Sequence, residues 1–187
     1  NERKNLENLL TRIASQIRAD VLIIDDNSPD KTGEFAEQLK IKFPFVHVLH
    51  REQKEGLGMA FKDGFRWALE RDYEVLFMMD ADLSHDPGAL PLFMEKIKDH
   101  DAVFGSRYLR GIRVFNWSFK RLLLSKSSNE FIKLMLGINS TDTTTAYKCF
   151  RREVLLSIDL QNMKGRQNAF FIELVFKTIR AGFKTTE

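Results

Sequence analysis

The sequence has one cysteine, no long apolar run and no large excess of charge, and each shortage excludes a class of protein. Cys149 is the only cysteine among 187 residues, so an internal disulfide framework is excluded. No apolar run approaches the roughly 20 residues that cross a bilayer. The net charge of +3 is compatible with an anionic ligand or a membrane surface, but it is far too small to indicate nucleic acid as a partner.

Short buried strands alternate with amphipathic helices over the first 106 residues. The apolar and charged fractions, 43% and 29%, are those of an ordinary globular domain. The pattern predicts strands at 21–24, 45–49, 75–79 and 102–105, with helices at 2–18, 32–41, 57–69 and 86–98. After residue 107 it predicts a helix at 120–136, a strand at 146–150, a helix at 152–157 and a last helix ending near 182. This alternation is typical of an α/β domain with a largely parallel sheet.

The most apolar of these strands, 75–79, is followed at once by two carboxylates, Asp80 and Asp82. Five apolar residues without a polar break indicate a strand buried on both faces. Two neighbouring carboxylates repel unless one is protonated or a cation lies between them, and a divalent cation such as Mg²⁺ or Mn²⁺ prefers oxygen ligands. Asp-x-Asp also occurs in solvated turns that cap a helix, so the spacing alone leaves that alternative open.

Charged loops follow three of the predicted strands. Asp25 and Asp26 follow the first strand, Asp80 and Asp82 follow the third, and Arg107 follows the fourth. In parallel α/β sheets ligands bind beyond the carboxyl ends of the strands. We therefore predict that these five side chains converge on one ligand site.

Four motifs, in this order along the chain, resemble those of the family 2 glycosyltransferases. They are Asp25-Asp26-x-Ser28-x-Asp30-x-Thr32, Gly56-Leu57-Gly58-x-Ala60 with Gly64, Met79-Asp80-Ala81-Asp82-Leu83-Ser84-His85-Asp86-Pro87, and Gly105-Ser106-Arg107-Tyr108. Within that family the sequence is most similar to the polyprenol-phosphate sugar transferases of the dolichol-phosphate mannosyltransferase type. The resemblance implies a GT-A fold, a Rossmann-like three-layer arrangement around a mainly parallel central sheet. Asn1-Glu2 resembles the end of the family's opening motif, which implies that the first strand is missing from this chain.

The resemblance also implies an activity, which is inverting, metal-dependent transfer of a hexose from a nucleotide sugar to a polyprenyl or dolichyl phosphate. GDP-mannose is the expected donor; a UDP-hexose or another nucleotide sugar, or a non-lipid glycan acceptor, is the alternative. The residues implied to bind the nucleotide sugar are Asp25, Asp26, Ser28, Gly56 and Asp80. Asp80 and Asp82 would hold Mg²⁺ or Mn²⁺ against the diphosphate. Ser84 stands where the mannosyltransferases carry a glutamine that adds a metal ligand, so it is the candidate third ligand.

The residues implied for the acceptor lie after residue 106. Arg107, Arg121 and Ser125 match the spacing of groups that grip the acceptor phosphate, and arginine suits this role because its guanidinium binds phosphate bidentately. Two solvated surface arginines are the alternative. Asp142 matches an active-site carboxylate, with a helix or turn cap as the alternative. The residues implied to be catalytic are Asp82, Asp142 and Arg107. Four further residues correspond to family positions. Ala146 and Lys148 stand where the family has a glycine and an arginine, and Glu173 and Glu187 match two glutamates of the family.

We predict one catalytic domain over residues 1–187, with a nucleotide-sugar half at 1–106 and an acceptor half at 107–187. An aromatic and basic stretch at the start of the second half suits a membrane-surface patch on the cytoplasmic side. Its members are Arg113, Phe115, Trp117, Phe119, Lys120 and Arg121. A partly buried loop cluster is the alternative.

Two hypotheses of other classes compete with an enzyme. A phosphorelay receiver domain also ends strands in aspartates, as at 21–26 and 75–80, but it needs no second carboxylate at Asp82 and leaves the chain after Arg107 unexplained. A non-catalytic nucleotide-sugar-binding protein of the same fold is harder to exclude. Turnover of a labelled nucleotide sugar separates that hypothesis from the enzyme.

Overall fold

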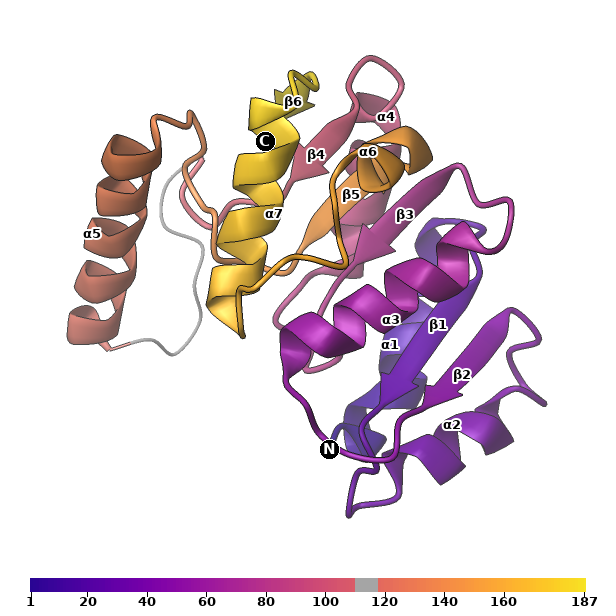
Figure 1. Ribbon diagram of the computed structural model, residues 1–187. Coiled ribbons are helices and arrows are strands. Elements are labelled where there is room, and N and C mark those ends of the chain that lie inside the picture. Colours follow the sequence, from indigo (N-terminus) through magenta and orange to yellow (C-terminus); the bar gives the residue numbers. More distant parts are fainter. Residues whose placement is uncertain (110–117) are drawn as a thin grey trace.

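The computed structural model describes residues 1–109 and 118–187, and Figure 1 shows their alternating helices and strands. The first half contains α1 (Arg3–Gln16), β1 (Val21–Asp25), α2 (Thr32–Leu39), β2 (Val46–His50), α3 (Leu57–Leu69), β3 (Val75–Met78), the short 3₁₀ helix η1 (Pro87–Ala89), α4 (Leu90–Lys96) and β4 (Ala102–Phe104). The second half contains α5 (Phe119–Leu136), β5 (Lys148–Arg151), α6 (Arg152–Ser157), α7 (Asn168–Arg180) and β6 (Thr185–Thr186). The bounds lie within about two residues of those predicted from apolar periodicity, which is the usual uncertainty of helix ends.

The described strands form two hydrogen-bonded sheets. β1 pairs in parallel with β2, from Val21 opposite Val46 to Asp25 opposite His50. The second sheet has the order β3-β5-β4-β6, in which β4 and β6 are parallel and β5 runs antiparallel to both β3 and β4. β3 and β4 therefore point the same way, and their carboxyl ends lie at one edge. β5 enters the sheet from that same edge, so its first residue, Lys148, lies beside the carboxyl ends of β3 and β4.

Helices cover both faces, so the molecule has three layers (Figure 1). On one face, apolar residues of α3, α6 and α7 pack on the second sheet, with Phe150, Phe170 and Leu174 fully buried. On the other face, α1 and α4 pack against Val103 and Cys149. Val75 and Phe77 of β3 are only partly buried but contact this second cluster, so β3 is covered on both sides as predicted.

Close packing of α3 joins the two sheets. A Cβ on Gly64 would lie 2.5 Å from Ile24 Cδ1 of β1, so any larger residue would force the end of the Ile24 side chain to move. The next residue, Phe65, packs into the core that contains Leu76 of β3. Gly56 precedes the helix with a φ of 98°, a conformation that glycine adopts without strain. The glycines of this motif thus have a backbone role.

Three of the six residues of the predicted membrane patch, Arg113, Phe115 and Trp117, lie outside the described residues. The side chains of Phe119 and Arg121 are also outside them. Within the described part of the chain, no helix is both long enough and apolar enough to cross a membrane.

Candidate functional site

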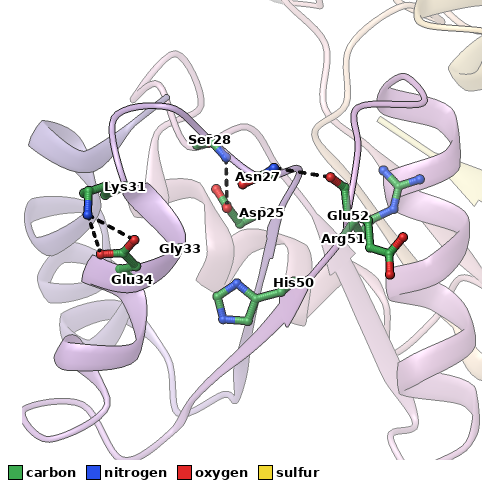
Figure 2. Close-up of a pocket in the computed structure, with 9 residues that line it drawn as sticks. All are labelled: Asp25, Asn27, Ser28, Lys31, Gly33, Glu34, His50, Arg51 and Glu52. Atoms are coloured by element: carbon green, nitrogen blue, oxygen red, sulfur yellow. Dashed lines mark hydrogen bonds and ion pairs between the residues drawn. The ribbon is translucent and has the colours of Figure 1, made fainter.

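A polar pocket of about 440 Å³ lies where β1 and β2 end, between β2 and the start of α2 (Figure 2). It is lined by Asp25, Asn27, Ser28, Lys31, Gly33, Glu34, His50, Arg51 and Glu52. Asp25 and Ser28, two of the predicted donor residues, are in this lining, whereas Asp26 and Gly56 are not. The volume lies in the range of small-molecule sites.

Asp25 is fixed at the base of this pocket. Its side chain is buried, and Oδ2 accepts a hydrogen bond from the backbone N–H of Ser28 at 3.2 Å. Gly33 lies so close that an added Cβ would be 2.6 Å from Asp25 Oδ2 and 3.0 Å from His50 Cε1. The helix α2 therefore approaches the carboxylate closely, and a side chain at Gly33 would displace it.

Asp26 points to a different partner. Its Oδ1 accepts from Arg51 Nη1 at 2.6 Å, and Arg51 also donates to Asp63 at 2.8 Å and to Glu55 at 2.8 Å. Burial alone would lower the pKa of Arg51, but its bonds to Asp26 and Asp63 raise that pKa overall. In the structure Asp26 therefore ties the end of β1 to the loop after β2.

Asp80 and Asp82 follow β3 in a tight turn. Burial, and then the negative charge of Asp82, raise the pKa of Asp80 to about 6, although the charge of Arg107 opposes this. Burial would also raise the pKa of Asp82, but hydrogen bonds from Ser84 lower it, including one from the Ser84 backbone N–H to Oδ1 at 2.9 Å. The two carboxylates therefore lie close enough to repel each other.

This carboxylate pair fits a divalent cation, because a cation between the two groups would remove their repulsion. Among the residues that the structure describes, no three His, Cys, Asp or Glu side chains are grouped to hold a metal ion. Asp80 and Asp82 would thus hold the ion from one side and leave its other positions to ligand oxygens and water, as Mg²⁺ is commonly bound beside phosphates. Ser84 is placed against Asp82 by its hydrogen bonds.

His85 stabilises the backbone just after β3 through a hydrogen bond to Asp80. Its Nδ1 accepts from the backbone N–H of Asp80 at 2.9 Å, so Nε2 carries the proton and donates to Thr145 Oγ1 at 3.2 Å. The ring stacks on Tyr147, and burial lowers the pKa of His85 to about 4. A neutral histidine thus fixes the backbone of Asp80.

Arg107 forms an ion pair with the buried Asp142 and lies near enough to Asp80 to affect its pKa. Arg107 Nε donates to Asp142 Oδ2 at 2.6 Å, and Nη2 donates to Oδ1 at 2.8 Å and to Thr144 Oγ1 at 2.7 Å. Asp142 is wholly buried; burial would raise its pKa, but Arg107 lowers it overall. The guanidinium is therefore held in one orientation, with a quarter of the side chain exposed.

Glu187 holds the loop that carries Asp142. Its carboxylate accepts from the Ser140 hydroxyl at 2.7 Å and from the backbone and hydroxyl of Thr141 at 2.7 and 2.6 Å. Thr141 also shares a hydrogen bond with Ser106, next to Arg107. Glu173 instead accepts from the backbone of Lys164 and Gly165, at the loop before α7.

Lys148 is fully buried at the start of β5, where it pairs with Met78, the last residue of β3, and with Phe104, the last residue of β4. Within the described part of the chain its Nζ has no hydrogen-bond partner, and it lies 5.2 Å from the centre of the Phe104 ring. Burial lowers the pKa of Lys148 to about 7, although the charges of Asp142 and Glu187 act to raise it. Lys148 is thus near enough to Asp142, Glu187 and Arg107 for their charges to affect its pKa.

One face of α5 contacts this part of the site. Ser125 Oγ accepts from the hydroxyl of Tyr108 at 2.7 Å, beside Arg107. One turn further, the buried Asn129 accepts from the backbone and hydroxyl of Thr143 at 2.9 and 3.0 Å. The predicted acceptor residue Ser125 is therefore at the site, while the side chain of Arg121 is outside the described residues.

A family model described as glycosyl transferase family 2 matches residues 1–158. The chain belongs to this family. Two bacterial relatives match its whole length. Undecaprenyl-phosphate mannosyltransferase of Micrococcus luteus is 41% identical over 188 residues, which cover 100% of this chain and 77% of that protein. Polyprenol monophosphomannose synthase of Mycolicibacterium smegmatis is 41% identical over 190 residues, covering 100% and 72%. This glycosyltransferase is also 37% identical, over 86% of its length and 46% of the relative, to dolichol-phosphate mannosyltransferase of Pyrococcus furiosus.

Solved structures confirm the GT-A fold that the motifs implied. Glucosyl-3-phosphoglycerate synthase from Mycobacterium tuberculosis, in complex with UDP, has a TM-score of 0.70 at 17% identity and covers 100% of this glycosyltransferase and 66% of that chain. A mannosyltransferase from Pyrobaculum calidifontis, in complex with GDP-Man and Mn²⁺, has a TM-score of 0.65 at 17% identity and covers 100% and 51%. At this identity the likeness shows the fold alone.

The sequence interpretation missed several residues that shape the site of this glycosyltransferase. His50 and Arg51 line the first pocket, and both stand where the second predicted strand ends. The rule that ligands bind beyond strand ends would have found them. Asn129 carried no such signal, because a polar residue on a helix gives no indication of the loop it meets.

Proposed function

We propose that this glycosyltransferase transfers mannose from GDP-mannose to a polyprenyl phosphate, with inversion and with help from a divalent cation. The observation that carries the proposal is the 41% identity, across the whole chain, to two proteins named for mannose transfer to polyprenyl phosphates. The geometry agrees with it, since a carboxylate pair and a guanidinium lie on the ends of β3 and β4 at one edge of the sheet.

The donor half of the proposal rests on the first pocket and the β3 turn. The pocket of about 440 Å³ offers a buried carboxylate, Asp25, and a histidine, His50, to the base and ribose of a nucleoside. Carboxylates suit this role because they accept hydrogen bonds from ribose hydroxyls and base N–H groups. Asp80 and Asp82 would lie at the diphosphate.

A divalent cation, when bound there, stabilises the charge that grows on the diphosphate leaving group. Asp80 and Asp82 would hold it, and His85 keeps the backbone of Asp80 in place through its Nδ1. Ser84 supports this set indirectly, because its N–H and hydroxyl fix the orientation of Asp82.

The acceptor half rests on Arg107. A phosphate monoester is already anionic near neutral pH, since its second pKa is about 6, so it needs a cation to hold it more than a base to activate it. Arg107 suits this, and Asp142 acts as a positioning residue because both of its oxygens accept hydrogen bonds from the guanidinium. Tyr108 and Ser125 extend the polar surface beside Arg107. The phosphate oxygen would then attack the sugar from the side opposite the diphosphate, which inverts the anomeric centre.

Radiolabelled transfer tests the proposal directly. The protein is incubated with GDP-[¹⁴C]mannose, undecaprenyl phosphate and Mn²⁺, and label in the organic phase is counted with and without a chelator. We expect a lipid-linked product that the chelator and Asp82→Asn abolish. Asp72→Asn, at the opposite end of β3, is the matched control and should keep full activity. Absence of a lipid product with every nucleotide sugar, or transfer only to water-soluble acceptors, would overturn the proposal.

The proposed acceptor places the reaction at the surface of a membrane, on its cytoplasmic side, where nucleotide sugars are available. This location follows from the acceptor and stands or falls with it. Vesicles that contain the acceptor, compared with acceptor dispersed in detergent, provide the corresponding test.

A further inference from the structure

Among the described residues, Lys148 is the buried polar side chain whose polar atom has no hydrogen-bond partner. Its ammonium is fully buried and lies 5.2 Å from the centre of the Phe104 ring. Taking an ammonium out of water without hydrogen bonds is costly unless nearby charges offset the loss. Lysine is rarely fully buried without a partner, so packing alone does not explain this residue.

The two carboxylates near Lys148 are occupied by other donors. Asp142 accepts five hydrogen bonds, three of them from Arg107. Glu187 accepts four from the loop 140–142. A carboxylate offers about four lone-pair sites, so both groups are satisfied without the lysine. Within the described chain, Lys148 therefore contributes a charge to this cluster and not a hydrogen bond.

The charges around Arg107 balance only when Lys148 is protonated. The cluster then contains two cations, Arg107 and Lys148, and two carboxylates, Asp142 and Glu187. With a neutral Lys148 the same cluster has one negative charge in excess. A phosphate that approaches the guanidinium, of which a quarter is exposed, would then be repelled by its surroundings.

We propose that Lys148 is a positioning residue for the acceptor phosphate, because its buried charge keeps the surroundings of Arg107 neutral instead of negative. The identity of the acceptor rests on the proposed function, whereas the charge balance does not. A bound phosphate favours the protonated ammonium. A neutral Lys148 therefore takes one proton from the solvent onto Nζ as the phosphate binds, and no covalent bond to the acceptor forms.

The affinity for the acceptor should consequently fall as the pH rises. Burial lowers the pKa of Lys148 to about 7, so the ammonium loses its proton mainly between about pH 7 and pH 9. His85, which faces the lysine from the turn after β3, has its pKa lowered by burial to about 4 and is neutral throughout this window. Arg107 and Asp142 keep their charges, because they are paired with each other. A phosphate that raises the pKa of Lys148 by one pH unit should make KM for the acceptor rise about tenfold across the window.

Steady-state transfer to a short, water-soluble isoprenyl phosphate tests this inference between pH 6.5 and pH 9.5. In the unaltered protein, KM for the acceptor should rise with pH. In Lys148→Arg it should stay low, since a guanidinium remains charged throughout this range. In Lys148→Met it should be high already at pH 7, with KM for the nucleotide sugar unchanged. The ionisation of the phosphate itself is the same in every comparison.

Lys98→Met is the matched control, because it removes the same charge from an exposed position before β4. It should keep the KM and the pH profile of the unaltered protein. Thermal unfolding shows whether each variant folds, and the unaltered protein with Lys148→Arg suffices for the comparison if Lys148→Met does not. Equal pH profiles of KM in the unaltered protein and Lys148→Arg would overturn the inference. An unchanged KM in a folded Lys148→Met variant would leave the lysine only a structural role.

Calorimetry separates this inference from the proposed function. Titration of the isoprenyl phosphate in two buffers of different ionisation enthalpy counts the protons taken up on binding, without any transfer. At pH 8 the unaltered protein should take up a fraction of a proton more than Lys148→Met or Lys148→Arg, and equal uptake would overturn the inference. Extra proton uptake without transfer from any nucleotide sugar would contradict the proposed function and support the role of Lys148. Transfer that Lys148→Met does not impair would contradict the role of Lys148 and support the proposed function.

Discussion

Asp80 and Asp82 repel each other at the end of β3, with 35% of the Asp80 side chain exposed, whereas Asp142 is wholly buried and Arg107 occupies both of its oxygens. At the donor end the charge of Arg107 offsets this repulsion only in part, since the pKa of Asp80 stays raised. At the acceptor end, opposite charges lie near one another, and the charges of Asp142, Glu187 and Arg107 all affect the pKa of Lys148. This contrast agrees with the proposal that the first end binds a cation together with its ligand, while at the second end Asp142 fixes the orientation of the Arg107 guanidinium.

Removing a carboxylate at the donor end should have the largest effect on transfer. Asp80→Asn should lower transfer by about 10²–10³-fold, the scale on which loss of one charge-stabilising group acts. It should leave the free energy of unfolding unchanged or raise it, because it removes repulsion with Asp82. Steady-state assays and thermal unfolding measure the two effects. A variant that unfolds more easily and transfers normally would reverse the assignment.

Removing the carboxylate at the acceptor end should act mainly on stability. Asp142→Asn leaves the Arg107 guanidinium without its counter-charge, which should cost about 2–3 kcal/mol of unfolding free energy. The melting temperature should fall by roughly 4–12 °C for a chain of this size. Asp26→Asn is the comparison, and should cost less because Arg51 keeps two other carboxylates. Equal losses in the two variants would contradict the distinction.

The buried Lys148 should give the protein a recognisable pH dependence of stability. Its folded pKa of about 7 lies below its ordinary value of 10.5, so between these values the unfolded chain binds more protons. Stability should therefore rise with pH through this window. Relative to Lys148→Met, the unaltered protein should gain about 2 kcal/mol between pH 7 and pH 9 in urea unfolding. Parallel pH profiles for the two proteins would show that Lys148 keeps its ordinary pKa when folded.

The smallest expected effect concerns protons and metal at the donor end. Asp80 has a pKa of about 6, so it is protonated in acid and must lose that proton before it binds a cation. Calorimetric titration with Mn²⁺ should show affinity falling by at most about tenfold per pH unit below pH 6. In Asp80→Asn this part of the pH dependence should disappear. Affinity that stays constant down to pH 5 would argue against Asp80 as a ligand.

Much of the donor end could be predicted from the sequence, because each of its residues follows a strand. Periodicity located β1 and β3, and Asp25 and Asp80 then fell at the carboxyl edge of the sheet. The α/β fold class was predicted from the same alternation of strands and helices, and it is confirmed. What the local pattern did not contain was the partner of Asp26, since Arg51 reaches it from 25 residues further along the chain.

The acceptor end was less predictable, because its interactions join distant segments. Arg107 and Asp142 are 35 residues apart, and the direction of β5, which brings Lys148 beside them, depends on pairing with both β3 and β4. A fully buried lysine also contradicts the expectation that lysines remain at the surface. Arg121 stays a prediction, as do the division of the domain at residue 106 and the roles of Arg107 and Asp142.

The division of labour between the two ends is tested most directly by donor binding alone. Titration of GDP-mannose in the presence of Mn²⁺ is compared for the unaltered protein, Asp82→Asn and Arg107→Lys. The account predicts that Asp82→Asn loses donor binding, whereas Arg107→Lys binds the donor normally and shows only a raised KM for the lipid phosphate. Normal donor binding by Asp82→Asn, or its loss in Arg107→Lys, would contradict the account.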